Sequence, residues 1–237
     1  KPNILSQLKM ELKKIILRIP IISHWKRLQQ KRRFKGSVQY WEKRYQEKGN
    51  SGSGSYERLA DFKAEILNEF VRQNQIRTVL EFGCGDGNQL TLAEYPRYTG
   101  LDVSPTAIIM CVERFRADAS KSFFIYDSLA FHDAAGIFRA ELVLSLDVLF
   151  HLVELEIFES YLKHLFQSAQ KYVIIYASDF DQDGQTIYRH EKRRSFTTYV
   201  ASQFPDWKLK EVIKNKFPVE KFGNQGSLSD FFIYEKL

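Results

Sequence analysis

The stretch Val79-Leu80-Glu81-Phe82-Gly83-Cys84-Gly85-Asp86-Gly87-Asn88 decides how the rest of the chain is interpreted. An apolar run enters a glycine-rich turn and an apolar-periodic segment follows, which predicts a strand, a tight turn and the N-terminus of a helix. Glycines there let a ligand approach the backbone closely, and free N–H groups at a helix start favour its anionic or polar end. The spacing is not the dinucleotide pattern GxGxxG, because the third glycine comes one residue early, and no Gly-Lys-Ser/Thr of a phosphate-binding loop follows.

Three further apolar runs end in or next to an acidic residue. These are residues 100–104 with Asp102, residues 123–126 with Asp127, and residues 142–146 with Asp147. Asp102 comes twenty-one residues after Glu81, at the place where a ribose-binding carboxylate follows the second strand of a nucleotide-binding sheet. The carboxyl ends of parallel strands meet at one edge of a sheet, so the pattern predicts a ligand site there.

These motifs resemble motif I of the class I S-adenosylmethionine-dependent methyltransferases, with Glu81-x-Gly83-x-Gly85-x-Gly87 as the glycine motif. The alternative is an α/β nucleotide-binding domain of another kind. Residues 40–104 also resemble bacterial methyltransferases that modify polysaccharides and small metabolites, which share a Tyr-Trp-x-x-Arg-Tyr segment (residues 40–45) and a Ser-Gly-x-Gly-Ser loop (residues 51–55). The resemblance covers about residues 38–237 and does not specify the acceptor.

Strand-like and helix-like segments alternate along the chain, which predicts an α/β fold with a parallel sheet covered by helices on both faces. The expected strands are residues 79–82, 97–103, 122–126, 141–146, 171–177, 207–214 and 230–234, and the expected helices are residues 56–70, 105–115, 153–170 and 195–204. The resemblance implies a Rossmann-like sheet of seven strands, mostly parallel, with an antiparallel last strand. We expect residues 37–237 to form this methyltransferase domain, with residues 37–75 as a helical lid over the cofactor.

The resemblance also implies S-adenosylmethionine as cofactor and S-adenosylhomocysteine as its product. The implied cofactor-binding residues are Tyr40, Arg44, Glu81, Gly83, Cys84, Gly85, Gly87, Asn88, Asp102, Val103, Tyr126, Asp127, Ser128 and Asp147. The glycines would lie against the methionine part, and the two oxygens of Asp102 would accept bonds from both ribose hydroxyls. Asp127 would accept a bond from the adenine amine, or is an ordinary turn residue.

Candidates for the chemistry follow the fourth and fifth strands. His151 and His190 are candidate general bases, since neutral imidazole takes a proton near neutral pH, and the alternative for His151 is a structural role. Arg189, Arg193 and Arg194 are candidates to bind a carboxylate or phosphate of the acceptor, the alternative being a solvated helix start. The implied reaction is an in-line attack of an acceptor oxygen or nitrogen on the sulfonium methyl, with the protein mainly orienting the reactants.

Composition and charge limit the setting. The chain has only two cysteines, Cys84 and Cys111, so we do not expect a disulfide framework. We expect a reducing, cytoplasmic location instead. No CxxC or HExxH cluster occurs, so the pattern predicts no metal site, and no apolar run reaches the roughly 18 residues of a membrane span. The chain begins with Lys1, so we expect a fragment of something longer.

The N-terminal arm, residues 1–36, carries most of the positive charge. Residues 1–35 hold eleven Lys/Arg and one acid, a net +10, which leaves −4 of the total +6 on the rest of the chain. Apolar residues recur at helical spacing up to Pro20, which predicts an amphipathic helix. It would dock on this domain or a neighbouring one, lie on the inner face of an anionic membrane, or bind RNA.

The sequence therefore predicts a methyltransferase acting on an oxygen or nitrogen of a small polar acceptor. A sugar or a phosphate-bearing precursor of a surface polysaccharide is the leading acceptor class, and the −4 body disfavours nucleic acid. The alternatives are a cofactor-binding module without catalysis, an RNA-directed methyltransferase that uses the basic arm, and aminopropyl transfer, which the arginine-rich residues 189–194 disfavour.

Overall fold

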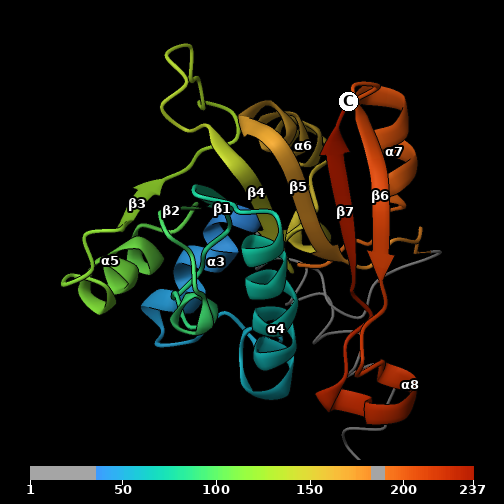
Figure 1. The fold of residues 1–237 in the computed structure, drawn as a ribbon. Coiled ribbons are helices and arrows are strands. Elements are labelled where there is room, and N and C mark those ends of the chain that lie inside the picture. The colour runs from blue at the N-terminus through green and yellow to red at the C-terminus, as the bar shows by residue number, and fades with distance from the viewer. Residues whose placement is uncertain (1–35, 183–189) are drawn as a thin grey trace, which may run out of the picture. The chain divides into compact units, whose positions relative to one another are not determined.

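The computed structural model of the chain describes residues 36–182 and 190–237. Residues 1–35 of the predicted arm and Arg189 lie outside these described residues. The described part forms one seven-stranded sheet with helices on both faces, as Figure 1 shows. The predicted Rossmann-like fold is confirmed.

The sheet has the strand order β3-β2-β1-β4-β5-β7-β6. Its strands are β1 (Val79–Phe82), β2 (Tyr98–Asp102), β3 (Lys121–Ile125), β4 (Ala140–Leu146), β5 (Ala169–Ala177), β6 (Trp207–Ile213) and β7 (Asp230–Lys236). Strands β3, β2, β1, β4 and β5 pair in parallel, and β7 runs antiparallel to both β5 and β6. The predicted antiparallel last strand is therefore correct, and it inserts between the two preceding strands.

Two apolar clusters cover the two faces of the sheet. The α-helices are α3 (Ser37–Gln46), α4 (Glu57–Gln73), α5 (Pro105–Arg114), α6 (Leu155–Ser168), α7 (Phe196–Gln203) and α8 (Val219–Phe222). Side chains of α4 and α5 pack with Leu142 and Leu144 of β4 on one face, and side chains of α6 and α7 pack with Val143 on the other. Alternate residues of a strand point to opposite faces, so a strand covered on both sides reads as a continuous apolar run.

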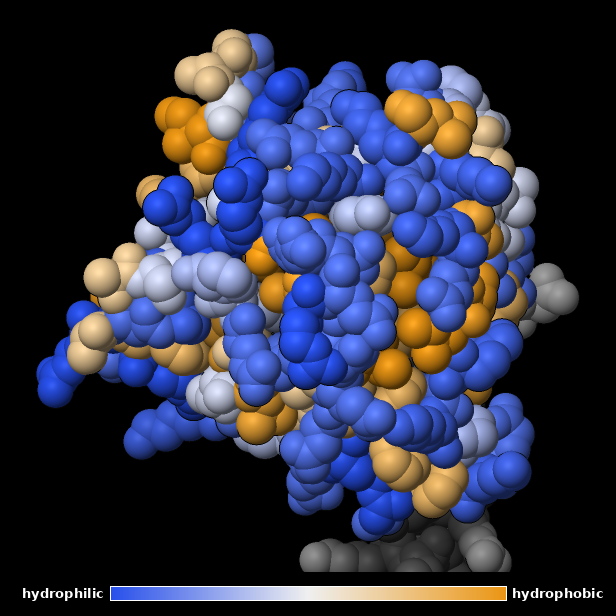
Figure 2. Space-filling view, viewed as in Figure 1, coloured by the Kyte–Doolittle hydropathy of each residue, from blue (hydrophilic) through white to orange (hydrophobic). Residues whose placement is uncertain are grey.

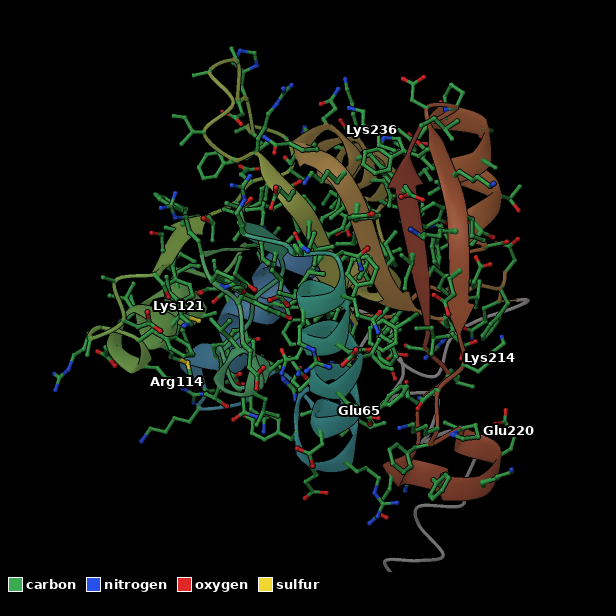
Figure 3. All side chains as sticks on the ribbon, in the orientation of Figure 1. Glu65, Arg114, Lys121, Lys214, Glu220 and Lys236 are labelled. Atoms are coloured by element: carbon green, nitrogen blue, oxygen red, sulfur yellow. The ribbon has the colours of Figure 1, made fainter. Side chains whose placement is uncertain are left out.

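The surface of the face that carries α4 is mainly hydrophilic, with an apolar strip over β7 and β6 (Figure 2). Charged side chains such as Arg114, Lys214 and Glu220 lie at its periphery (Figure 3). Glu65 of α4 pairs with Lys216 at 2.7 Å and so ties this helix to the segment after β6. Within residues 36–182 and 190–237, no helix combines the length and apolar character that a membrane crossing requires.

The segment after the glycine turn differs from the prediction. Instead of an α-helix, a short 3₁₀ helix, η2 (Gln89–Leu92), follows the turn within this described stretch. Pro96 explains the difference, because the residue before a proline avoids helical backbone angles and too few positions remain for a full helix. The turn itself therefore has to supply the backbone groups that a helix N-terminus would have offered.

A buried ion pair stands out beneath the carboxyl ends of the strands. Lys63 of α4 is completely buried, and its ammonium nitrogen lies 2.8 Å from Oδ2 of Asp147, just after β4. Ser229, just before β7, donates to the other oxygen of Asp147 at 3.1 Å. Asp147 has a left-handed backbone, with φ of 58°, a region that Asp and Asn tolerate better than other non-glycine residues.

We expect Asp147→Asn to lower the free energy of unfolding by about 3–5 kcal/mol, because it leaves the buried Lys63 ammonium unpaired while keeping the backbone preference. Lys63→Met should cost less, since Asp147 keeps its bond from Ser229 and some contact with water. Urea unfolding measures these free energies. The loss of unfolding free energy in the double variant should be at least about 1 kcal/mol smaller than the sum of the losses in the two single variants. Additive losses would mean that the two side chains do not stabilise each other.

Candidate functional site

An inner cavity of about 890 Å³, counted to its open mouth, lies at the carboxyl ends of β1, β2 and β4. Its lining includes ten residues predicted from the sequence: Glu81, Gly83, Cys84, Gly85, Asp102, Val103, Tyr126, Ser128, Asp147 and His151. It also includes residues that the sequence analysis did not select, among them Ser37, Trp41, Tyr45, Ser51, Ser55, Lys63 and Asp86.

Helix α3 is fixed above this cavity at both ends. At its start, the Ser37 backbone N–H and hydroxyl both donate to the carboxylate of Glu154. Further along, Glu42 accepts bonds from the hydroxyls of Ser104 and Thr106 at 2.6 and 2.8 Å, in the first turn of α5. These ties set the rotation of α3, and Trp41 is among the residues that it brings to the inner cavity.

The loop between α3 and α4 closes against the glycine turn. Asp86 accepts bonds from the Ser51 N–H at 3.0 Å and from the Tyr56 hydroxyl at 2.8 Å, and its own N–H donates to Ser51 Oγ. Asn88 donates to the carbonyl of Ser55 at 2.8 Å. The loop therefore covers the inner cavity in a closed position, and its movement as a lid stays a prediction.

At two glycines of the turn, the Cβ atom of any other residue would collide with neighbouring side chains. At Gly85, an added Cβ would come within 2.3 Å of Ser51 Oγ and 2.9 Å of the Tyr45 hydroxyl. At Gly83, it would come within 2.4 Å of Val148. Both have positive φ, which L-residues rarely adopt, so the turn brings bare backbone to the cavity wall.

Asp102 is held in a fixed position by backbone groups. Oδ2 accepts the Gly85 N–H and Oδ1 accepts the Ser104 N–H, each at 2.9 Å. Burial raises the pKa of Asp102 to about 6, although these hydrogen bonds act in the opposite direction. Each carboxylate oxygen has room for a further bond, so the charged form can accept two more donors from a ligand.

Glu81 is buried in the middle of the same wall. The Tyr98 hydroxyl donates to it at 2.6 Å. Burial raises the pKa of Glu81 to about 7, against the hydrogen bond from Tyr98 and the positive charge of Lys63. A group that titrates near neutrality in a cavity is a frequent mark of a functional site.

A second, more open cavity of about 1130 Å³ adjoins the first. This outer cavity is lined by Tyr40, Arg44, His190 and Arg193, by residues 51–54, and by residues near the start of β7. Trp41, Ser51, Asp147 and His151 line both cavities. These four residues mark the boundary at which a group bound in one cavity meets a group bound in the other.

Of the two candidate bases, His151 lies at this boundary and His190 lines the outer cavity next to it. His151 Nδ1 is 3.1 Å from the carbonyl oxygen of His190, and the His151 ring contacts Trp41 edge-on. Burial lowers the pKa of His151 to about 3, and burial also lowers the pKa of His190. The His151 ring is therefore neutral at physiological pH and a weak proton acceptor, which argues against the general-base interpretation.

Several predicted residues lie elsewhere. Tyr40 and Arg44 are in the outer cavity, so they are not placed where the cofactor prediction needs them, because α3 turns Trp41 and Tyr45 inward instead. Asp127 is exposed, binds the Leu129 N–H at 2.9 Å and is absent from the residues described as lining the two cavities.

Three further predicted residues make contacts that support the fold: Gly87, Asn88 and Arg194. Gly87 faces Phe115 and Cys111, and Asn88 holds the covering loop. Arg194 donates to the carbonyls of Leu152 and Val153 at 2.6 and 2.7 Å and lies over the Phe158 ring, which explains why it does not reach the outer cavity.

The sequence of residues 50–222 matches the family described as "Methyltransferase domain". The chain belongs to the S-adenosylmethionine-dependent methyltransferases. Among curated proteins, none matches its sequence.

Solved structures with the same fold come from functionally different methyltransferases. The N-methyltransferase NodS from Bradyrhizobium japonicum, in complex with S-adenosylhomocysteine, has a TM-score of 0.62 at 16% identity, covering 85% of this chain and 99% of that one. The methyltransferase domain of bacterial CtHen1-C has a TM-score of 0.57 at 18% identity, covering 73% and 96%. Magnesium protoporphyrin IX methyltransferase from Synechocystis PCC 6803, with bound S-adenosylhomocysteine, has a TM-score of 0.54 at 14% identity, covering 76% and 85%.

The inner cavity of this methyltransferase fits S-adenosylmethionine. Gly83 and Gly85 provide a wall without side chains, and Asp102 keeps acceptor capacity for the two ribose hydroxyls. The aromatic side chains of Trp41 and Tyr126 supply apolar surface around them. When bound, the cofactor supplies a methyl group activated by the positive sulfonium.

We expect Asp102→Asn to weaken S-adenosylhomocysteine binding by about 1.5–3 kcal/mol, the usual loss for hydrogen bonds to a charged group. Asp127→Ala is the matched control, since its exposed carboxylate lies away from the cavity. Isothermal titration calorimetry measures both. A large loss in Asp127→Ala with none in Asp102→Asn would favour the sequence-based interpretation of Asp127 over the structure.

The affinity for S-adenosylhomocysteine should depend on pH through Asp102. Its pKa is raised to about 6, so the charged carboxylate that we expect to accept both ribose hydroxyls is lost as the pH falls through that value. Binding should weaken by up to about tenfold per pH unit below it and level off above it. Calorimetry from pH 5 to 8 should show this slope in the wild type and a flatter profile in Asp102→Asn; identical profiles would assign the dependence to another group.

Proposed function

We propose that this methyltransferase transfers the methyl group to an oxygen or nitrogen of a small polar acceptor with an anionic group, bound in the outer cavity. The observation that carries the proposal is the contact of the two cavities along Trp41, Ser51, Asp147 and His151. Methyl transfer needs donor and acceptor in line and within contact distance, and two adjoining cavities provide that arrangement.

The side chains of the outer cavity favour an anion. Arg193 donates to Glu191 and Gln182, while its Nε is buried without a hydrogen-bond partner among the described residues. Arg44 lies in the same cavity and is oriented by the Asn50 carbonyl, 2.6 Å from its Nε. A guanidinium binds carboxylate and phosphate through directed hydrogen bonds, which supports a sugar phosphate or another phosphate-bearing precursor of a surface polysaccharide as the acceptor class.

The charge distribution favours a small acceptor over RNA. Outside the basic arm the chain carries a net charge of −4, whereas a nucleic-acid site presents a positive surface that follows the phosphate backbone. The likeness to CtHen1-C is one of fold, at 18% identity. A cavity lined by two arginines matches a single anionic group better than a polymer.

The proposed location is the cytoplasm, with the basic arm contributing contact with the inner face of the membrane or with a partner domain. The two described cysteines are buried and unpaired, which suits a reducing compartment. The net +10 of residues 1–35 suits an anionic surface. Deletion of these residues should abolish binding to anionic vesicles if the membrane is the target.

The acceptor can be identified by mass spectrometry. The chain is incubated with methyl-labelled S-adenosylmethionine and pools of sugar phosphates, nucleotide sugars and neutral sugars. The proposal predicts label in a phosphate-bearing product and little in the neutral pool. Label found only in RNA, or no label in any pool together with intact cofactor binding, would contradict it.

With an acceptor in hand, Arg193→Ala should lower kcat/KM by about ten- to a hundredfold for the anionic acceptor, the cost of a lost charge-assisted contact. The matched control is Lys192→Ala, which removes the same charge from an exposed neighbour outside the cavity lining. A neutral analogue of the acceptor should show a much smaller loss with Arg193→Ala. Equal losses for both acceptors would mean that Arg193 supports the structure of the loop and does not bind the anion.

A further inference from the structure

Two imidazoles and a carboxylate lie close together in the outer cavity, and one of them, His151, also lines the inner cavity. His151, His190 and Glu191 each offer one ligand atom, and these atoms lie within 4.8 Å of one another. His190 Nε2 is 3.8 Å from Glu191 Oε1. No metal site was predicted from the sequence because these residues have no short spacing: they come from segments about 40 positions apart.

Backbone hydrogen bonds hold the two segments together. The Lys192 N–H donates to the carbonyl of Phe150 at 2.7 Å. This bond joins the segment that carries His190 to the segment that carries His151. Arg194 then binds the carbonyls of Leu152 and Val153. The approach of His190 and Glu191 to His151 is therefore fixed by the fold on both sides of the cluster.

The hydrogen bond of His151 defines its tautomer. A backbone carbonyl only accepts, so Nδ1, 3.1 Å from the carbonyl oxygen of His190, carries the proton and Nε2 keeps its lone pair. Metal-binding histidines show this pattern, in which the second ring nitrogen donates to a carbonyl or carboxylate. The ring is also fixed by edge contact with Trp41 at 4.8 Å between centroids.

The other two groups are oriented as well. The His190 ring is stacked on Tyr40, with 4.2 Å between centroids and 10° between planes. Arg193 holds Glu191 Oε2 at 3.0 Å, while Oε1 of the same carboxylate faces His190. The positive charge of Arg193 opposes a cation here, so the affinity should be lower than that of a closed structural zinc site.

The donor set selects the type of ion. Two imidazole nitrogens and one carboxylate oxygen suit zinc, manganese, iron or cobalt, whereas magnesium and calcium prefer oxygen ligands alone. Metal–ligand bonds of about 2.0–2.1 Å bring ligand atoms to about 3 Å from one another, so binding would draw these side chains together. Three protein ligands leave further coordination positions open, as in catalytic metal sites.

We infer that His151, His190 and Glu191 bind one divalent transition-metal ion in the outer cavity, next to its boundary with the inner one. All three residues line the outer cavity, so an ion held by them would be able to take an oxygen or nitrogen of the acceptor there. The part of the inference that concerns the acceptor rests on the proposed function, and the binding of the ion does not.

The test measures metal binding directly. The full chain is stripped with EDTA, dialysed and titrated by calorimetry with Zn²⁺, and with Co²⁺ followed by its visible absorption. We expect one ion per chain, and a loss of affinity of at least about tenfold in the His190→Ala/Glu191→Gln variant, whose substitutions lie in a loop and leave the apolar core intact. His132→Ala, which removes an exposed histidine elsewhere, is the matched control and should bind like the wild type.

Two results would overturn the inference: no saturable binding in the wild type, or unchanged binding in the double variant, which would place the ion elsewhere. His151→Ala adds an independent check of the third ligand, with circular dichroism to confirm folding. The outcome is separate from that of the proposed function. Metal binding without an anionic acceptor would leave this site standing, and methyl transfer by a chain that binds no ion would leave the proposed function standing.

Discussion

The buried ion pair between Lys63 and Asp147 is the constraint on which the site depends. It links α4, the end of β4 and, through Ser229, the start of β7. An ammonium without any exposed surface has to be paired, so these three elements keep one relative position. Both cavities depend on this link, since Asp147 lines each of them, Lys63 lines the inner one and Ser229 lines the outer one.

Carboxylates that bind neighbouring segments place the remaining parts of the site. Glu154 holds the start of α3, Glu42 joins α3 to α5, and Asp86 holds the covering loop on the glycine turn. Asp102 connects that turn to the segment after β2. Each of these acids accepts at least one backbone N–H, so loops that would otherwise leave polar groups unsatisfied are fixed against their neighbours. The site is thus assembled mainly by hydrogen bonds between segments distant in sequence.

The strands and Asp102 could be predicted because their signals are local. A continuous apolar run followed by an acid predicts both a strand and the acidic residue at its carboxyl end. The face of α3 could not be predicted in this way. Tyr40 and Arg44 were selected from a motif, whereas Glu154 and Thr106, 117 and 64 positions away from their partners in α3, decide that Trp41 and Tyr45 face inward. Lys63, Asp86 and the convergence of His151 with His190 have no local signature either. Asp127 shows the converse, since this acid after a strand binds the Leu129 N–H of its own turn, which was the alternative to adenine binding.

The loop between α3 and α4 touches both cavities, with Ser51 and Ser55 lining the inner one and residues 51–54 lining the outer one. A ligand in either cavity therefore adds contacts that favour the same closed arrangement. By thermodynamic linkage the effect is reciprocal: cofactor raises the affinity for acceptor by the factor by which acceptor raises the affinity for cofactor. With the acceptor in the outer cavity, as proposed, the two substrates should bind with positive synergy, and release of the first product should weaken the binding of the second.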